Sequence, residues 1–357
     1  MQHSGIAADG RDRRGGRDRG VDEFDLQLIN ALQLAPRAPW ARLGEVLGAD
    51  ATTLARRWDR LTGAGLARVT AFPAAPSLSR QPMAYLELTC RNGTVAEVSR
   101  ALAQDPGTLS IQFTAGRHQL LLTVSRPHEL AGYLLDWIGS FPDVAAYETH
   151  VITRIPFQAS RWHLHALAPG QRRALQAMAA PSPGPGAPPP VSEADQAIIG
   201  ALAADGRASY GALGRAAGVS ASTAARRLDR LLRGGVVGLR CDVARRELGW
   251  PAAAVLWGSV AYEELERAAA DLQETVPELR FCSTVAGSEN ALLVVWLRAI
   301  ADLPEVERRL EARLPGLRLT DRRIVLRTMK LMGQVLDGEG RYAGTVPPSM
   351  REPDARG

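Results

Sequence analysis

The amino-acid sequence predicts an α+β protein in which two winged helix-turn-helix domains are each followed by a ferredoxin-like β-α-β-β-α-β domain. At 357 residues the chain is long enough for two to three domains. Shifting the sequence by 170 positions aligns many identical residues, from Val21 with Val191 to Gly65 with Gly235. A period this long makes each copy a complete module, and in each copy short helical segments precede alternating strand and helix patterns.

The composition is that of a folded protein of a reducing compartment. Hydrophobic residues make up 46% and charged residues 23% of the chain, which excludes a wholly disordered or collagen-like protein. Cys90, Cys241 and Cys282 lie far apart without Cys-x-x-Cys spacing, so we expect a cytoplasmic location and neither a disulfide framework nor a zinc site. No apolar run approaches the roughly 20 residues that span a bilayer, so we expect no membrane association. A net charge of +5 allows a polyanionic partner.

Composition also marks the boundaries between the domains. Residues 1–20 hold five arginines and five glycines and are predicted to be a disordered basic arm. Residues 165–190, which include the stretch PSPGPGAPPP, are predicted to be a Pro/Gly-rich linker, and residues 333–357 a disordered tail. The helix-turn-helix domains are expected at 21–75 and 191–245, and the ferredoxin-like domains at 82–156 and 250–330.

Each predicted helix-turn-helix starts with a helix that has an acid on its apolar face. In residues 24–34, Leu28, Ile29 and Leu32 recur at helical spacing, and Asp25 falls on the same face, where a carboxylate needs a partner. A second short helix ends at a glycine suited to the left-handed turn that stops helices, and a residue that favours the N-cap follows it. The glycine and the N-cap are Gly48 and Asp50 in the first copy, and Gly218 and Ser220 in the second. Asp195 is the second copy's equivalent of Asp25.

The third helix carries the predicted DNA-binding face. Leu54, Trp58 and Leu61 form its apolar stripe, and hydroxyl and arginine side chains occupy the far side. Hydroxyls in the first turn with arginines behind them suit a helix that reads base edges and holds phosphates. The candidate DNA-binding residues are Thr52, Thr53, Arg56, Arg57 and Arg60 in the first copy and Ser222, Thr223, Arg226, Arg227 and Arg230 in the second.

Two features of these domains have more than one interpretation. Arg57 and Arg227 lie between the apolar stripe and the outward face, where they either pair with Asp25 and Asp195 or contact DNA; we favour the ion pair. The segments 66–72 and 236–241 are short and partly β-branched, which is consistent with a wing or with a strand leading onward.

The second part of each copy alternates between strand and helix patterns. Period-2 alternation indicates strands, and apolar residues at helical spacing indicate two amphipathic helices in each copy. The resulting order, β-α-β-β-α-β, is the ferredoxin-like motif. Its elements are expected at 85–89, 95–103, on both sides of 114–119, 128–138 and 144–154, and again at 252–260, 262–273, 279–285, 290–297, 302–313 and 317–328.

These residues together resemble a known family. The pattern Thr-x-x-x-Arg-Arg-x-x-Arg-Leu-x-x-x-Gly in the third helix, with Asp25 before it and Gly48 at the turn, is similar to the helix-turn-helix of Lrp/AsnC-type (leucine-responsive/asparagine regulator) transcription factors. Family members usually hold one copy of each domain and pair as dimers. The resemblance therefore implies a sequence-specific DNA-binding regulator built as a fused pseudo-dimer, with double-stranded DNA and further copies of the chain as partners.

The resemblance also implies where a small-molecule effector, an amino acid or another metabolite, would bind. The family's turn between the middle strands typically ends in Gly-x-x-Asp, whereas this chain reads Thr-Ala-Gly-x-x-Gln and Val-Ala-Gly-x-x-Asn. An amide lacks the charge that pairs with an ammonium group, which argues against an ordinary α-amino acid at this turn. Arg117 and His118 could face an anionic ligand or be exposed polar residues. The candidate effector-binding residues are Thr114, Gly116, Arg117, Gln119, Thr284, Gly287 and Asn290.

Two other functions fit the same domains. Some similar fused proteins are siroheme decarboxylases, which use histidine and arginine within His-Asn and Asn-x-Trp-Phe runs. This sequence lacks those runs and its histidines do not recur in the second copy, so we expect neither an enzyme nor a bound cofactor or metal. The other alternative is an oligomerisation adaptor that does not bind DNA, which would show no salt-sensitive DNA binding.

Overall fold

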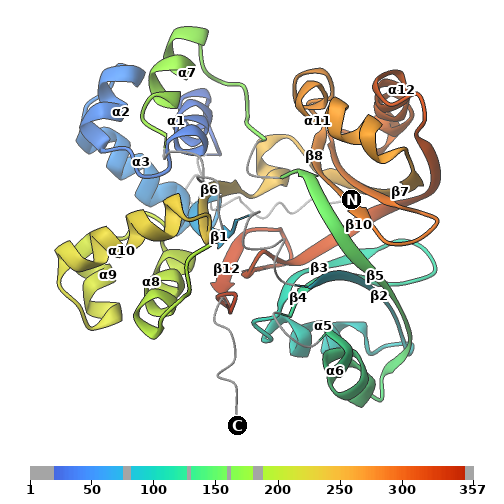
Figure 1. Ribbon diagram of the computed structural model, residues 1–357. Coiled ribbons are helices and arrows are strands. Elements are labelled where there is room, and N and C mark those ends of the chain that lie inside the picture. The colour runs from blue at the N-terminus through green and yellow to red at the C-terminus, as the bar shows by residue number, and fades with distance from the viewer. Residues whose placement is uncertain (1–19, 75–81, 127–129, 159–161, 180–187, 350–357) are drawn as a thin grey trace, which may run out of the picture.

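The structure is a computed structural model that describes residues 20–74, 82–126, 130–158, 162–179 and 188–349. Helical domains from the two copies lie on one side of the molecule and strand-rich domains on the other (Figure 1). Apart from Gly20, the predicted basic arm lies outside the described residues. None of the described helices is both long enough and apolar enough to cross a membrane.

The helix-turn-helix domains begin and end their helices where local chemistry requires it. Asp22 and Asp25 form a capping box at the start of α1, Gly48 ends α2 in a left-handed conformation (φ +71°), and Asp50 caps α3. The equivalent residues of the second copy have the same roles. The helices are α1 (Glu23–Leu34), α2 (Trp40–Leu47) and α3 (Ala51–Gly63), and then α8 (Glu193–Ala204), α9 (Tyr210–Ala217) and α10 (Ala221–Arg233).

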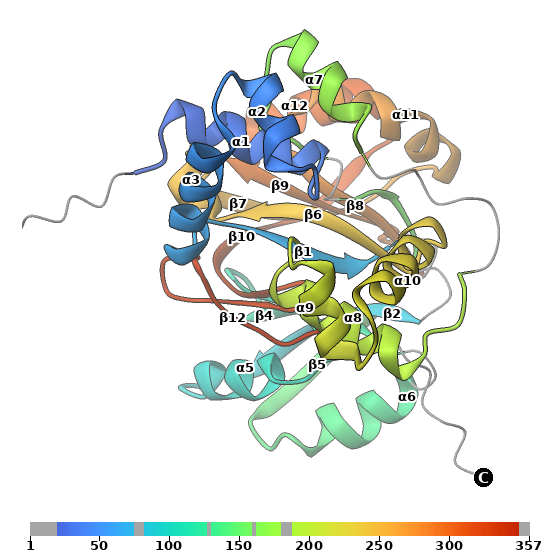
Figure 2. The same cartoon turned by 90° about the vertical axis from the view of Figure 1, so that its left-hand side faces the viewer.

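Of the two interpretations of the segment that follows each helix-turn-helix, a hairpin wing or a strand leading onward, the structure has a single strand and no hairpin within the residues it describes. β1 (Ala67–Pro73) pairs antiparallel with β6 (Val237–Val243), so each strand finds its partner in the other copy instead of folding back as a hairpin. Burial explains this pairing, because α1 packs against β6 and α8 against β1, and the N–H of Gly206 donates to the carbonyl of Val69 at 2.8 Å. Figure 2 shows this ribbon between the two domains, with α3 and α10 on opposite sides of it.

Both strand-rich domains have the element order β-α-β-β-α-β. In the first, α6 (Leu130–Gly132) continues as the π-helix η1 (Tyr133–Trp137) and the 3-10 helix η2 (Ile138–Ser140). The other elements of the first domain are β2 (Met83–Cys90), α5 (Val95–Ala103), β3 (Thr108–Thr114), β4 (Leu120–Ser125) and β5 (Val144–Phe157). The second domain follows the 3-10 helix η4 (Arg245–Leu248) and consists of β7 (Ala252–Ser259), α11 (Tyr262–Thr275), β8 (Leu279–Val285), β9 (Ala291–Leu297), η5 (Ile300–Asp302), α12 (Leu303–Arg313) and β10 (Arg318–Leu331).

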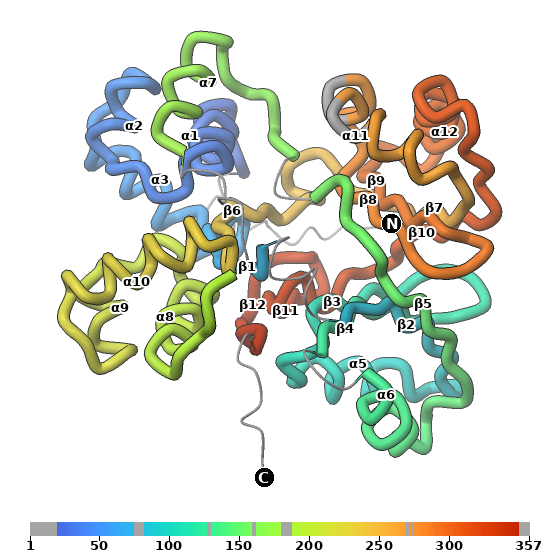
Figure 3. The backbone as a smooth tube through the Cα atoms, viewed as in Figure 1, coloured from blue at the N-terminus to red at the C-terminus, as the bar shows by residue number. Residues whose placement is uncertain are grey.

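Two long strands join the domains into one ring of strands. β5 pairs with β2 through residues 144–151 and with β8 through residues 152–157. β10 pairs with β7 through residues 318–324 and with β3 through residues 325–330. The ring therefore runs β10-β3-β4-β2-β5-β8-β9-β7 and returns to β10. Figure 3 traces β5 and β10 across the boundary between the two domains.

The predicted linker is shorter than expected, because its first part folds against the first helix-turn-helix. Residues 169–176 form helix α7 (Pro169–Gln176), which packs on α1 and α2 and buries Leu175 completely. Asn30 and Gln33, on the buried side of α1, accept hydrogen bonds from the backbone of the segment that precedes α7. These buried amides need partners, and the segment supplies them. Residues 180–187 lie outside the described residues.

The predicted disordered tail also contains structure. Met332 (φ +47°) and Gly333 (φ +88°) turn the chain into a hairpin of β11 (Gln334–Leu336) and β12 (Tyr342–Thr345), which extends the sheet beside β10. The amide of Gln334 is buried and donates to the Thr70 hydroxyl at 3.1 Å and the Ala203 carbonyl at 2.9 Å. The tail thus ties the ring to the β1–β6 ribbon, and its last eight residues, 350–357, lie outside the described chain.

Candidate nucleic-acid interface

Helices α3 and α10 present the same outward face. Leu54, Trp58 and Leu61 of α3 are buried, as Ala224, Leu228 and Leu231 of α10 are. The opposite side of each helix exposes a hydroxyl and an arginine, Thr52 with Arg56 in α3 and Ser222 with Arg226 in α10. Among the residues that the structure describes, the guanidinium groups of Arg56 and Arg226 have neither a hydrogen-bond nor an ion-pair partner. They are therefore free to hold a polyanion.

The first-turn hydroxyls next to them have a structural role. The Thr53 hydroxyl donates to the Asp50 carboxylate at 2.6 Å, and the Thr53 N–H donates to the same side chain at 2.9 Å. In α10 the Ser220 hydroxyl donates to the Thr223 hydroxyl at 3.0 Å. Both pairs belong to N-caps, so Thr53 and Thr223 orient the start of the helix. Thr52 and Ser222 are more exposed, and the Ser222 hydroxyl lies 3.0 Å from that of Ser220.

A fully buried carboxylate holds two arginines in each domain. Arg57 Nη1 lies 2.9 Å from Asp25 Oδ1 and 2.7 Å from Asp22 Oδ2, which confirms the predicted ion pair with Asp25. In the second copy, Arg227 Nη1 lies 3.0 Å from Asp195 Oδ1. A buried charge of this kind is stable because it is paired and hydrogen-bonded.

Arg60 and Arg230 differ from our prediction of a purely outward orientation. Arg60 pairs with the second oxygen of Asp25, and Arg230 Nη2 lies 2.5 Å from Asp195 Oδ2. The sequence assigned both arginines to the DNA-facing side, but their side chains are long enough to reach back over the helix to the buried acid. Each oxygen of the buried carboxylate thus pairs with a different arginine, Arg57 and Arg60 in the first copy and Arg227 and Arg230 in the second.

The charge of Asp195 is maintained by its surroundings. Burial by itself favours the neutral acid, yet hydrogen bonds from the Ser192 hydroxyl and backbone and from Arg230 and Arg227 outweigh it and keep the pKa of Asp195 below its ordinary value. The acid therefore stays ionised and the arginines stay bound.

A reciprocal pair of arginines fixes the two helix-turn-helix domains relative to each other. Each guanidinium reaches across to two backbone carbonyls of the other copy, at 2.7 and 2.9 Å: Arg37 to Gly206 and Ala208, and Arg207 to Pro36 and Ala38. The sequence predicted no role for these residues, although Arg37 and Arg207 are one repeat apart. The recurrence of these arginines in both copies could have indicated a shared role, but recurrence alone does not distinguish a contact between the two copies from a contact with DNA.

The predicted effector-binding turns are largely occupied by their own hydrogen bonds. The Gln119 amide accepts from the Cys90 N–H at 2.9 Å, and the Asn290 amide accepts from the Val260 N–H and donates to its carbonyl, both at 3.0 Å. Thr114 donates to the His118 carbonyl, and the hydroxyls of Thr284 and Thr153 are 2.7 Å apart. Gly116 and Gly287 have positive φ and form the turns. These groups hold strand ends together.

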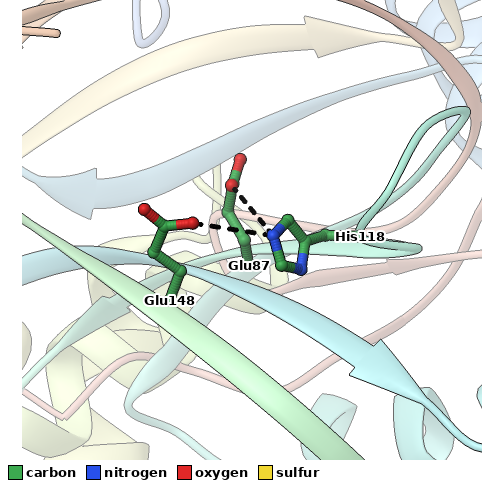
Figure 4. Close-up of side chains that lie close together, drawn as sticks. All are labelled: Glu87, His118 and Glu148. Carbon is green, nitrogen blue, oxygen red and sulfur yellow. Dashed lines mark ion pairs between the residues drawn. The ribbon is translucent and has the colours of Figure 1, made fainter.

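His118 and Arg117 lie in a charge network rather than beside a free anion. His118 Nε2 is 3.6 Å from Glu148 Oε2 and 4.0 Å from Glu87 Oε2. Figure 4 shows both carboxylates turned toward the His118 ring. Three ligand atoms this close could hold a metal ion. However, Arg117 donates to His118 Nε2 at 3.2 Å and lies 3.5 Å from Glu148, and Arg323 pairs with Glu87, so arginines already balance both carboxylates.

These domains define a helix-turn-helix protein, and the comparisons identify its family. The AsnC-type helix-turn-helix domain matches residues 21–62 and 192–232. The HTH-type transcriptional regulator Rv2324 of Mycobacterium tuberculosis is 32% identical over 110 residues, 29% of this chain and 72% of that protein. The HTH-type transcriptional regulator FL11 of Pyrococcus horikoshii is 25% identical over 136 residues, 38% of this chain and 90% of that protein.

The chain therefore belongs to the Lrp/AsnC family of transcriptional regulators, with the helix-turn-helix present twice, as the sequence predicted. A solved structure, the siroheme decarboxylase NirDL, is similar over 87% of this chain and 93% of its own, with a TM-score of 0.57 and 13% sequence identity. At this identity the likeness shows a shared fold and nothing about activity.

Proposed function

We propose that the chain is a sequence-specific DNA-binding transcriptional regulator of the cytoplasm, in which one polypeptide supplies both DNA-reading domains of a dimer. One observation carries the proposal: at equivalent positions α3 and α10 expose a hydroxyl residue and an arginine that has no partner among the described residues, although the two copies differ at many other positions. A helix with polar residues at its start and free guanidinium groups behind them suits the major groove.

The packing of the two copies supports a fused pseudo-dimer. The β1–β6 ribbon, the crossed contacts of Arg37 and Arg207, and the ring closed by β5 and β10 each relate one copy to the other in a reciprocal way. Under this proposal the strand-rich parts are ferredoxin-like domains that hold the reading heads at a fixed separation. Because the exposed residues Asp50 and Thr52 correspond to Ser220 and Ser222, the two heads can prefer different half-sites.

Further association of pseudo-dimers is part of the proposal. Leu135 and Trp137 on η1 are 71% and 42% exposed, and large apolar side chains in one exposed turn favour a protein contact. Light scattering of the purified chain measures this directly, and replacing both residues with serine should reduce the mass of any larger assembly to that of one chain.

The experiment that tests the function is genome-wide recovery of DNA bound by the purified chain. We expect enrichment of a limited set of sites, and loss of that enrichment in Arg56→Ala/Arg226→Ala. The matched control is Arg91→Ala/Arg100→Ala, which removes two exposed arginines from the strand-rich domain and should keep the enrichment. Equal recovery by all three proteins would contradict the assigned interface.

The siroheme decarboxylase alternative has one observation in its favour, the fold likeness to NirDL across both halves of the chain. Incubation of the purified chain with siroheme, followed by mass spectrometry of the tetrapyrrole, separates the two functions. We expect no loss of CO₂ from siroheme, and decarboxylation at a catalytic rate would favour the enzyme.

A further inference from the structure

A cavity of about 160 Å³ lies between the ring of strands and the β1–β6 ribbon. Alternate residues of the strands line it, such as Met83 and Tyr85 of β2 and Leu292 and Val294 of β9. Their strand neighbours Leu86 and Leu293 point the other way, into the cores beneath the helices. A dry apolar cavity of about 150 Å³ accommodates benzene, so the enclosed part suits an apolar body of about one ring.

The charges around this cavity are strongly unbalanced. Arg240, Arg245, Arg246, Arg280 and Arg327 line it, and the described residues that line it include no aspartate or glutamate. Arg240 and Arg280 are buried and both contact the carboxylate of Asp242 behind the wall, whose oxygens lie 2.7 Å from Arg240 Nη2 and 3.4 Å from Arg280 Nη2. The side chains that line the cavity in the described part of the chain therefore carry an excess of positive charge, which points toward an anion.

The two exposed arginines at this cavity are available for a ligand. Arg246 follows β6, Arg327 lies in β10, and within the described chain neither guanidinium has a hydrogen-bond or ion-pair partner. On the inner wall the Trp296 ring provides a flat apolar surface, and the Arg280 guanidinium lies 4.5 Å from the centre of that ring. The cavity thus offers an apolar floor and charged groups at two depths.

We propose that this cavity binds a small organic anion that has an apolar body of about one ring and more than one carboxylate, and that this anion is the effector of the regulator. The second half of this statement rests on the proposed function. The site is separate from the turns to which the family resemblance assigned effector binding, because none of the candidate residues of those turns lines the cavity.

The position of the cavity explains how occupancy would reach DNA. Phe72 of β1 and Arg240 of β6 both line it, so a bound anion touches the ribbon that joins the two reading heads. A ligand changes DNA affinity only if it binds one arrangement of the heads more tightly than another. Carboxylates that draw Arg240, Arg246 and Arg327 together would favour one spacing of α3 and α10.

The binding half is tested by calorimetry of the full chain with phthalate, benzoate and benzamide, which share one ring and carry two, one and no negative charges. We expect phthalate to bind most tightly and benzamide most weakly. Arg246→Gln/Arg327→Gln should weaken phthalate binding by about tenfold or more, the loss expected for one charge-assisted hydrogen bond, and leave benzamide unchanged. Phenyl phosphate distinguishes phosphate from carboxylate recognition, and its binding more tightly than phthalate would overturn the carboxylate assignment.

The control variant is Arg91→Gln/Arg100→Gln, which changes the net charge equally at exposed residues outside the cavity. Equal affinity for the three probes, or an equal loss in both double variants, would overturn the site. The regulatory half is tested by DNA affinity with and without phthalate: a shift supports it, and phthalate binding without a shift overturns it. Absence of DNA binding under all conditions would refute the proposed function and leave the phthalate result standing.

Discussion

Replacing two adjacent arginines of α3 with glutamine, one at a time, should affect different properties: fold stability for Arg57 and DNA affinity for Arg56. Arg57→Gln removes a guanidinium that holds Asp22 at 2.7 Å and the fully buried Asp25 at 2.9 Å. Losing the sole partner of a buried charge costs about 3–5 kcal/mol, but Arg60 still pairs with Asp25, so we expect about 1.5–3 kcal/mol, the range for a hydrogen bond to a charged group. Arg56→Gln removes an exposed side chain and should change the free energy of unfolding by less than about 0.5 kcal/mol.

Urea denaturation measures the free energy of unfolding, and fluorescence anisotropy of a labelled duplex at several salt concentrations measures DNA binding. Arg56→Gln should lower DNA affinity and reduce the slope of log affinity against log salt by about 0.9, the share of one phosphate contact. The second copy offers a matched pair of variants: Arg226→Gln should lower DNA affinity, and Arg227→Gln, which loses the contact with Asp195, should lower the stability of the fold. The reasoning is refuted if Arg56→Gln destabilises the fold as much as Arg57→Gln, or if Arg57→Gln leaves stability unchanged.

Three further predictions follow from other contacts. Burial, aided by Arg172, lowers the pKa of His163 from 6.5 to about 4. As the pH drops from about 6.5 to 4, the unfolded chain therefore takes up a proton before the folded chain does, and the free energy of unfolding falls. His163→Gln should flatten a plot of the urea midpoint against pH in this range, and an unchanged plot would show that His163 does not cause the pH dependence. Arg37→Ala/Arg207→Ala removes four hydrogen bonds that fix the orientation of the two helix-turn-helix domains, while the β1–β6 ribbon still joins them. A mobility-shift assay should show about tenfold weaker binding to a duplex with two half-sites and little change on a single half-site. Asn290→Ala leaves the Val260 N–H and carbonyl without their partner, and urea denaturation should show a loss of about 1–3 kcal/mol; an effect under 0.5 kcal/mol would show that these bonds are not needed.

Local chemistry made much of the helical part predictable from the sequence. Gly48 and Asp50 mark where α2 ends and α3 begins, and the helical spacing of Leu54, Trp58 and Leu61 identifies the buried face. The pairing of Arg57 with Asp25 also followed, because an acid on an apolar face requires a cation nearby. These features depend on neighbours within a few residues or on one stripe of a helix.

The features that the sequence missed depend on contacts between distant segments. Nothing in Val237–Val243 says that its partner strand is Ala67–Pro73, because a short apolar strand satisfies the same pattern as a wing. Arg60 was assigned outward because its Cα faces solvent, although its long side chain returns to Asp25. Residues 169–176 were assigned to the linker because the neighbouring prolines dominate the composition, whereas Leu175 and the amides of α1 give that segment a docking site.

The most direct test of two reading heads in one chain is a hydroxyl-radical footprint on a DNA site recovered from the genome. A single chain should protect two segments of the duplex, centred about one helical turn apart, and Arg226→Ala should expose one of them while the other stays protected. A single protected segment, or equal loss of protection across the whole site in that variant, would contradict the account.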